Sequence, residues 1–163
     1  MTQFSQDQQR IDAVKIAIIS SGWHREIVAN SVVAASSELV SRQVPADQIH
    51  YFEVPGAFEI PLHAQRLARS GEFDAIIACG LVVDGGIYRH EFVAAAVIDG
   101  LMRVQLDTDV PVFSAVLTPH HFHEHAEHLN YFATHFKQKG KEVGTACAET
   151  LLSLARLPGY NNL

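Results

Sequence analysis

Along most of this chain, short and mostly apolar runs alternate with longer stretches whose apolar residues recur at helical spacing. The short runs cover residues 15–20, 50–54, 74–80 and 111–117, and β-branched side chains are frequent in them. The helical stretches cover residues 26–43, 60–70 and 90–107, and two further ones, 119–138 and 140–157, close the chain. Continuous apolar runs are typical of strands buried on both faces, so the alternation predicts βαβ units and a parallel sheet covered by helices on both sides.

The length and the apolar content predict one folded domain. The chain has 163 residues, of which 48% are hydrophobic and 18% charged, and this is enough to close a single core. We expect a flexible N-terminal segment over residues 1–14, the domain over residues 15–158 and a short tail over residues 159–163.

The charge balance argues against two classes of partner. Twelve Lys and Arg against eighteen Asp and Glu leave a formal charge of −6, so neither nucleic acid nor an anionic membrane is expected as a partner. The N-terminus lacks the pattern of a secretory signal, and no apolar run approaches the length of a membrane span. Cys79 and Cys147 are too few and too far apart for a disulfide framework. These features predict a cytoplasmic protein.

Histidine is the unusual element of the composition. There are ten histidines, and six of them fall within residues 120–135. His121, His125 and His128 share one face of a helix, a spacing that could hold a transition metal. The HExxH motif is absent, however, and histidines are also tolerated on a solvated or interface helix. We favour that second interpretation and expect no metal site.

Other familiar motifs are missing as well. The chain has no GxGxxG, no GxxxxGK[ST] and no GxSxG. A dinucleotide fold, a P-loop nucleotidase and a serine hydrolase therefore lack their signatures.

In an open parallel sheet, ligands bind outside the carboxyl ends of the strands. This rule selects the loops at residues 21–25, 54–59, 81–90 and 118–120. Trp23 there can offer an aromatic face to a planar ligand, or it can fill an oligomer contact. Glu59 can accept hydrogen bonds from sugar hydroxyls, or it can serve the N-terminus of a helix. Gly85 and Gly86 let backbone amides approach an anion, although a plain turn needs the same glycines.

Two of these loops carry a specific resemblance. Residues 54–61 read VPGAFEIP and residues 80–93 read GLVVDGGIYRHEFV. In these motifs, and over most of residues 15–154, the chain resembles the lumazine synthase family. It is most similar to the second type found in alphaproteobacteria, which forms decamers.

The resemblance implies a flavodoxin-like three-layer α/β/α sandwich with a four-stranded parallel sheet. It also implies the penultimate step of riboflavin synthesis. In that step 5-amino-6-(D-ribitylamino)uracil condenses with 3,4-dihydroxy-2-butanone 4-phosphate to give 6,7-dimethyl-8-ribityllumazine, phosphate and water. The expected partners are these small-molecule substrates and further copies of the chain, as a pentamer or a dimer of pentamers. No cofactor is expected.

Site residues follow from the same resemblance, position by position. Trp23 matches the aromatic residue that stacks on the pyrimidine. The segment that holds the ribityl chain in the family matches Ala57, Phe58 and Glu59. The loop at the uracil edge matches Leu81, Val82 and Val83. The turn that binds the phosphate of the four-carbon substrate matches Gly86 and Ile87.

The chain departs from the family pattern at four positions. Arg89 stands where most members have a proton-transferring histidine, and His90 follows it. Arginine stays protonated, so it can stabilise an anion, whereas His90 could move protons if the helix start turns it inward. Ser114 replaces a phenylalanine, and His128 replaces a phosphate-binding arginine.

These departures leave room for another function. A catalytically weak relative could carry or sense lumazine or riboflavin. A flavodoxin-like electron carrier is a third possibility, but residues 20–22 are too short for its phosphate loop.

Overall fold

Four parallel strands form the centre of the molecule. The computed structural model describes residues 11–83, 89–119 and 126–159. The strand order is β2-β1-β3-β4. From β1 the chain places β2 on one side and then β3 and β4 on the other, so the strand order reverses between β1 and β3. The strands are β1 (Ile16–Ser21), β2 (Ile49–Val54), β3 (Ala75–Leu81) and β4 (Val112–Leu117).

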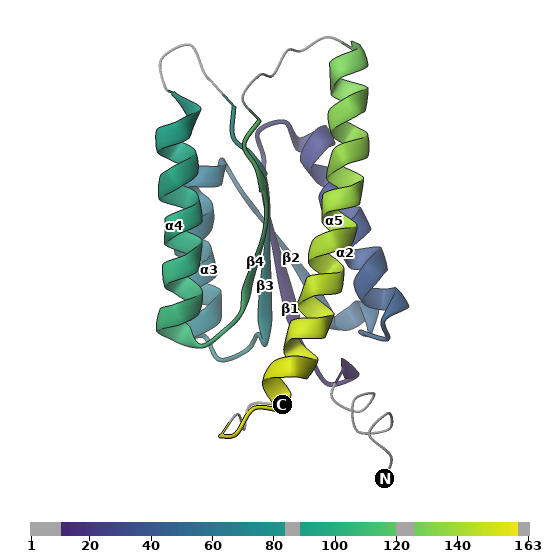
Figure 1. The fold of residues 1–163 in the computed structure, drawn as a ribbon, viewed down its shortest axis with the longest axis vertical. Coiled ribbons are helices and arrows are strands. Elements are labelled where there is room, and N and C mark those ends of the chain that lie inside the picture. The colour runs from purple at the N-terminus through teal and green to yellow at the C-terminus, as the bar shows by residue number, and fades with distance from the viewer. Residues whose placement is uncertain (1–10, 84–88, 120–125, 160–163) are drawn as a thin grey trace.

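Two helices cover each face of the sheet (Figure 1). Helices α2 (Arg25–Ser41) and α5 (Ala126–Ala155) lie on one face, and α3 (Ile60–Arg69) and α4 (His90–Thr108) lie on the other. Two 3₁₀ turns, η1 (Ala46–Gln48) and η2 (Ala57–Glu59), flank β2. The expected flavodoxin-like three-layer sandwich is confirmed.

Alternate residues of the strands feed two separate cores. Ile18 and Ile77 pack with α2 and α5, while Ile19 and Ile76 pack with α3 and α4. All seven residues of β3 are buried, because this strand lies inside the sheet with helices on both faces. Residues before the first strand, Ile11 and Val14, also join the α2–α5 core.

The end of the chain differs from the sequence expectation. Two helices were predicted, meeting near Gly140, but α5 runs unbroken for 30 residues. Glycine weakens an exposed helix, but here burial against α2 outweighs that preference. A Cβ at residue 140 would lie 2.3 Å from the carbonyl oxygen of Ser31, and one at residue 144 would lie 2.9 Å from that of Ala35. The two glycines therefore allow the helix backbones to approach closely.

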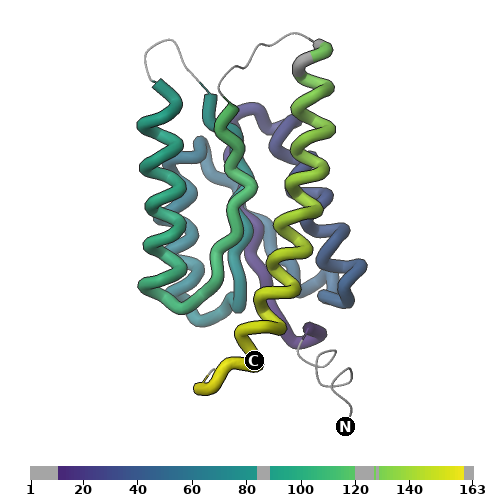
Figure 2. Tube along the Cα trace, in the orientation of Figure 1, coloured from purple at the N-terminus to yellow at the C-terminus, as the bar shows by residue number. Residues whose placement is uncertain are grey.

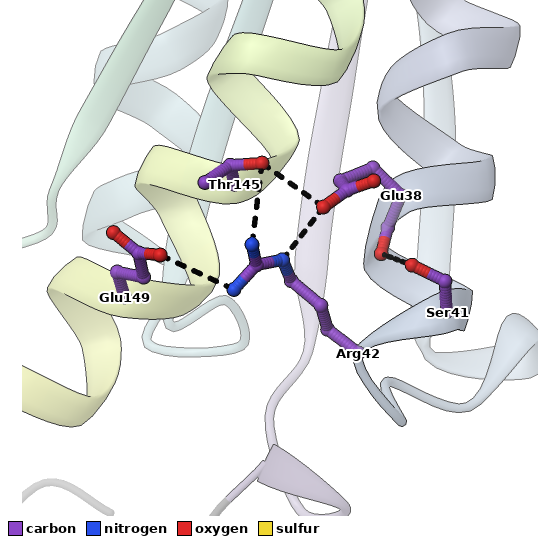
Figure 3. Close-up of polar contacts among 5 residues, drawn as sticks. All are labelled: Glu38, Ser41, Arg42, Thr145 and Glu149. Atoms are coloured by element: carbon purple, nitrogen blue, oxygen red, sulfur yellow. Dashed lines mark hydrogen bonds and ion pairs between the residues drawn. The ribbon is translucent and has the colours of Figure 1, made fainter.

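A polar network joins the same two helices further along (Figure 3). The Arg42 guanidinium donates to the carboxylate of Glu38 at 2.7 Å and to that of Glu149 at 3.3 Å. The Thr145 hydroxyl donates to Glu38 at 2.9 Å. Hydrogen bonds from Arg42 and then Thr145 hold the pKa of Glu38 below its ordinary value.

The amino edge of the sheet is closed by short contacts. The Lys15 backbone N–H donates to the Asp74 carboxylate at 2.7 Å, and the Asp74 N–H donates to the Lys15 carbonyl at 2.8 Å. The ammonium of Lys15 also lies 5.4 Å from the centre of the Phe73 ring. Gly71, in the preceding turn, has φ 74° and nothing within 4 Å of the position a Cβ would take.

At the opposite, carboxyl edge the chain leaves every strand for the loops that the sequence selected (Figure 2). Across the three described ranges, no helix is both long and apolar enough to span a lipid bilayer.

Candidate active site at the carboxyl edge of the sheet

A hollow of about 400 Å³ opens at the carboxyl ends of β1 and β2. It has apolar, aromatic and charged walls, as expected for a small-molecule site. Its lining residues are Gly22, Trp23, Arg25, Glu53, Val54 and Pro55.

Trp23 is the aromatic wall of this hollow. It lies in the tight connection between β1 and α2, and 72% of its surface is exposed. The Gly22 N–H donates to the Val54 carbonyl at 2.7 Å, which ties this connection to the end of β2. The indole therefore offers a large apolar face without belonging to the core of its own chain.

The segment after β2 begins with the turn η2. Ala57 is buried under it, whereas Phe58 is 65% exposed. The Glu59 carboxylate accepts the Gly56 backbone N–H at 2.9 Å. The structure thus shows one of the two interpretations of Glu59, in which its carboxylate stabilises the start of a helix. This hydrogen bond uses one of the two carboxylate oxygens.

The segment after β3 is built differently. Leu81 and Val82 are both 5% exposed and contribute their side chains to opposite cores. The Val82 N–H donates to the Leu117 carbonyl at 2.8 Å, and Val83 is half-buried. A ligand that reaches this segment will therefore meet mainly backbone atoms.

Arg89 and His90 stand at the start of α4. Arg89 is exposed and extended, and it precedes the first helical residue, His90. The His90 ring is only 5% exposed, and its Nδ1 lies 3.9 Å from a Glu91 carboxylate oxygen. The helix start thus turns His90 inward. This is the orientation that we expected His90 to need if it is to transfer protons. Gly86 and Ile87 lie outside the described residues.

The last two candidate residues, Ser114 and His128, are not among the described residues that line the Trp23 hollow. Ser114 is exposed in the middle of the edge strand β4 and pairs in register with Ala78. Since β3 lies between β4 and β1, one chain does not bring Ser114 into the Trp23 hollow. His128 belongs to the first turn of α5, and its side chain lies outside the described part.

Two lining residues were missed by the sequence reasoning. The Arg25 guanidinium pairs with the Glu53 carboxylate at 2.5 Å across the hollow. The sequence pattern places Arg25 in a loop at the carboxyl edge and Glu53 in a strand, and it indicates a site role for neither. A charged residue directly before the last position of a strand, at the carboxyl edge of the sheet, was the signal that could have identified Glu53.

The described residues near this edge show neither a reactive thiol nor a cluster of metal ligands. Burial raises the pKa of the Cys79 thiol to about 11, so this cysteine stays protonated at neutral pH and is not a nucleophile. In the described part of the chain, no three His, Cys, Asp or Glu side chains lie close enough to hold a metal ion. His121 and His125 are outside that part.

The fold and the hollow define a class. This is an open α/β protein with a hollow at the carboxyl ends of its parallel strands, next to the reversal of strand order, which is where proteins of this class bind their ligands. The model of the family described as 6,7-dimethyl-8-ribityllumazine synthase matches residues 13–155, and the chain belongs to that family.

Curated relatives agree with the family match. The chain is 62% identical over 148 residues to 6,7-dimethyl-8-ribityllumazine synthase of Rhodococcus erythropolis, covering 91% of this chain and 96% of that protein. It is 55% identical over 145 residues to 6,7-dimethyl-8-ribityllumazine synthase 2 of Bradyrhizobium diazoefficiens, covering 89% and 87%. It is 52% identical over 137 residues to the protein of that same name from Pseudomonas syringae, covering 84% and 81%.

Proposed function

We propose that this protein is an enzyme of riboflavin biosynthesis, a transferase that forms 6,7-dimethyl-8-ribityllumazine. Its substrates are 5-amino-6-(D-ribitylamino)uracil and 3,4-dihydroxy-2-butanone 4-phosphate, and phosphate and water are released. The observation that carries the proposal is the 62% identity to a named 6,7-dimethyl-8-ribityllumazine synthase over 96% of that protein's length.

The hollow at the carboxyl edge is the proposed site of the pyrimidine substrate. A planar heterocycle gains from stacking on an aromatic face, and Trp23 offers one that is largely exposed. The ribityl chain then extends along residues 57–59, where η2 begins, and backbone atoms of residues 81–83 meet the uracil edge. Because Leu81 and Val82 are buried, this last contact depends on backbone groups of the segment other than the Val82 N–H, which already donates to the Leu117 carbonyl.

The four-carbon phosphate is proposed to bind at the start of α4 and α5. Gly86, Ile87, Arg89 and His128 are the candidates for holding the phosphate. A guanidinium is a strong phosphate partner, and the exposed position of Arg89 leaves it accessible. His90, turned inward at the first turn of α4, is the proposed proton-transfer group. Ser114 is proposed to contribute from another copy of the chain.

The proposed reaction depends mainly on positioning. Formation of a Schiff base between an amine and a ketone, loss of phosphate and ring closure proceed slowly without an enzyme. Holding the two substrates in register can therefore supply much of the acceleration. Loss of a single proton-transfer group should slow the reaction rather than abolish it.

We further propose that the working form is a homo-oligomer, a pentamer or a dimer of pentamers. Helices α3 and α4 expose Leu62, Phe92, Met102 and Leu106. A groove of about 320 Å³ runs between the two helices. Large apolar side chains exposed on two neighbouring helices are typical of a protein interface. A second copy of the chain is the occupant that would also bring Ser114 toward a site that it does not reach within one chain.

A cytoplasmic location completes the proposal. Both cysteines are unpaired and buried, which suits a reducing compartment.

One assay tests the reaction directly. The purified protein is mixed with both substrates, and formation of the lumazine is followed by its absorbance. We expect a rate well above that of a protein-free control, and a much lower rate for Trp23→Ala. A rate equal to the control would refute the proposal, and tight lumazine binding without turnover would favour the carrier or sensor.

A second experiment tests the assembly. Native mass spectrometry should give a multiple of five chains. Leu106→Glu should weaken the assembly, whereas Leu157→Glu, which changes another exposed leucine away from α3 and α4, should not. A monomeric wild-type protein would contradict the proposal.

A further inference from the structure

Trp23 needs an external support if it is to act as a stacking surface. Its side chain is 72% exposed, so core packing does not hold the indole in one orientation. Its direction must instead be set by the backbone of residues 22–25, which connects β1 to α2. The contacts of that backbone therefore decide where the ring points.

The connection contains an uncommon turn. His24 has φ 54° and ψ 40°, the left-handed region that a residue with a side chain seldom adopts. Its carbonyl accepts the N–H groups of Ile27 at 2.9 Å and Val28 at 3.0 Å, so this turn also starts α2. Unfavourable backbone conformations of this kind persist where neighbouring contacts hold them.

The carboxylate of Glu53 bonds to Arg25, on one side of the turn, and lies beside Gly22, on the other. Its Oε1 accepts the Arg25 guanidinium at 2.5 Å. A Cβ added to Gly22 would lie 3.6 Å from that same oxygen and 3.4 Å from the Pro55 carbonyl oxygen. Trp23 and His24 thus lie in the sequence between Gly22, which bonds to Val54, and Arg25, so both ends of this connection are fixed to the end of β2.

The same ion pair contributes little to the stability of the fold. The Arg25 side chain is 68% exposed and that of Glu53 is 48% exposed. Exposed pairs of this kind are screened by water and salt. Its main effect is therefore geometric, because it fastens the start of α2, two residues after Trp23, to the end of β2.

We propose that Arg25 and Glu53 are a positioning pair that holds Trp23 in the orientation on which the pyrimidine substrate stacks. The inference rests on the proposed function and adds two residues to it. Neither residue takes part in the reaction; they act through Trp23.

The chain itself provides the probe for a test. Trp23 is the only tryptophan in the sequence, so the intrinsic tryptophan fluorescence reports on this one side chain. Wild type, Arg25→Met and Glu53→Gln are each titrated with the lumazine product, and quenching of the tryptophan emission gives the Kd. The charge-swapped double variant R25E/E53R tests for rescue. Glu26→Gln is the matched control, because it removes an exposed carboxylate beside Arg25 that does not belong to the pair.

We expect each single variant to raise the Kd, and the KM for the pyrimidine substrate, by about three- to fivefold. The KM for the four-carbon phosphate and the melting temperature should stay near their wild-type values. The swapped pair should recover part of the loss, and E26Q should behave as wild type. High salt should weaken binding by the wild type more than by E53Q.

Two outcomes would overturn the inference, and they are distinguishable. If the wild type is quenched by the product and both single variants bind it equally well, the pair does not position Trp23. If the wild type turns over its substrates but its tryptophan emission does not respond to the product, Trp23 is not the stacking surface, and the inference fails together with that role. Absence of turnover in the wild type would instead contradict the proposed function.

Discussion

The close contact between α2 and α5 should make Gly140 the most sensitive of the glycines that the structure describes. In Gly140→Ala, the new Cβ would lie 2.3 Å from the Ser31 carbonyl oxygen, 2.8 Å from the Ser31 Cα and 2.9 Å from the Ala34 Cβ. Two of these atoms are backbone, so no side-chain rotation relieves the overlap. The helices must separate by about 1 Å to restore ordinary contact.

The magnitude follows from two opposing effects. Overpacking of this kind costs about 1–3 kcal/mol, while alanine in place of glycine favours a helix by about 0.8–1 kcal/mol. Because the overlap involves backbone atoms, the cost should lie in the upper part of that range, at about 2–3 kcal/mol. The net loss should then be about 1–2 kcal/mol. For a chain of this size that corresponds to a fall of about 2–8 °C in melting temperature.

The same variant should affect the proposed site. Ala126, at the start of α5, lies about 21 Å along the helix from Gly140. A tilt at Gly140 therefore displaces the end that carries His128, relative to the start of α2 at Arg25. We expect a higher KM for the phosphate substrate.

The assay is thermal unfolding followed by circular dichroism, at one fixed protein concentration because assembly shifts the midpoint. Gly100→Ala is the control. Its Cβ would meet only the Pro61 ring, at 3.1 and 3.2 Å, so the gain in helix preference should roughly cancel the strain. If G140A melts at or above the wild-type temperature, the argument from close helix approach is refuted.

Three further predictions follow from buried and charged groups. Among the described residues, Ser21 has a buried hydroxyl without a hydrogen-bond partner, so Ser21→Ala should raise the free energy of unfolding by about 1 kcal/mol in urea denaturation; a loss would show that the hydroxyl is satisfied. Burial raises the pKa of both the Cys79 and the Cys147 thiols, so the native protein should resist iodoacetamide at pH 8 and react after unfolding, as mass spectrometry would show. Arg42 lowers the pKa of Glu38 from 4.5, so this carboxylate stabilises the fold above that pH and loses its effect as the pH falls further. The stability difference between wild type and E38Q should therefore be full at pH 7 and shrink below pH 4.5; a difference independent of pH would contradict the role of Arg42.

Much of the fold could be predicted from the pattern of apolar residues. Each predicted strand begins and ends within about one residue of the observed one. The reason is clearest for β1 and β3, because strands with two buried faces leave continuous apolar runs. The unbroken α5 was missed, since the sequence shows a glycine but not the helix that covers it. The two 3₁₀ turns were also missed, because so short an element has no periodicity.

The site was predictable only in part. The rule for parallel sheets placed Trp23 at the carboxyl edge, where the hollow lies. The pairing of Arg25 with Glu53 could not be foreseen, because it depends on two segments that are neighbours only in the folded sheet. The burial of Leu81 and Val82 likewise depends on the two helical layers, and motif matching could not show that only their backbone is offered to a ligand.

The amino edge has a practical consequence for protein engineering. Lys15 and Asp74 bond to each other through both backbone and side chain, so the strands beside the turn at Gly71 are fastened independently of the turn itself. Gly71 has open space around it, and the turn faces away from the end of the sheet that holds Trp23. A foreign peptide inserted after Ser70 should therefore be displayed on the surface without disturbing the hollow. In an assembly of several copies, such a turn would present the same peptide once per subunit.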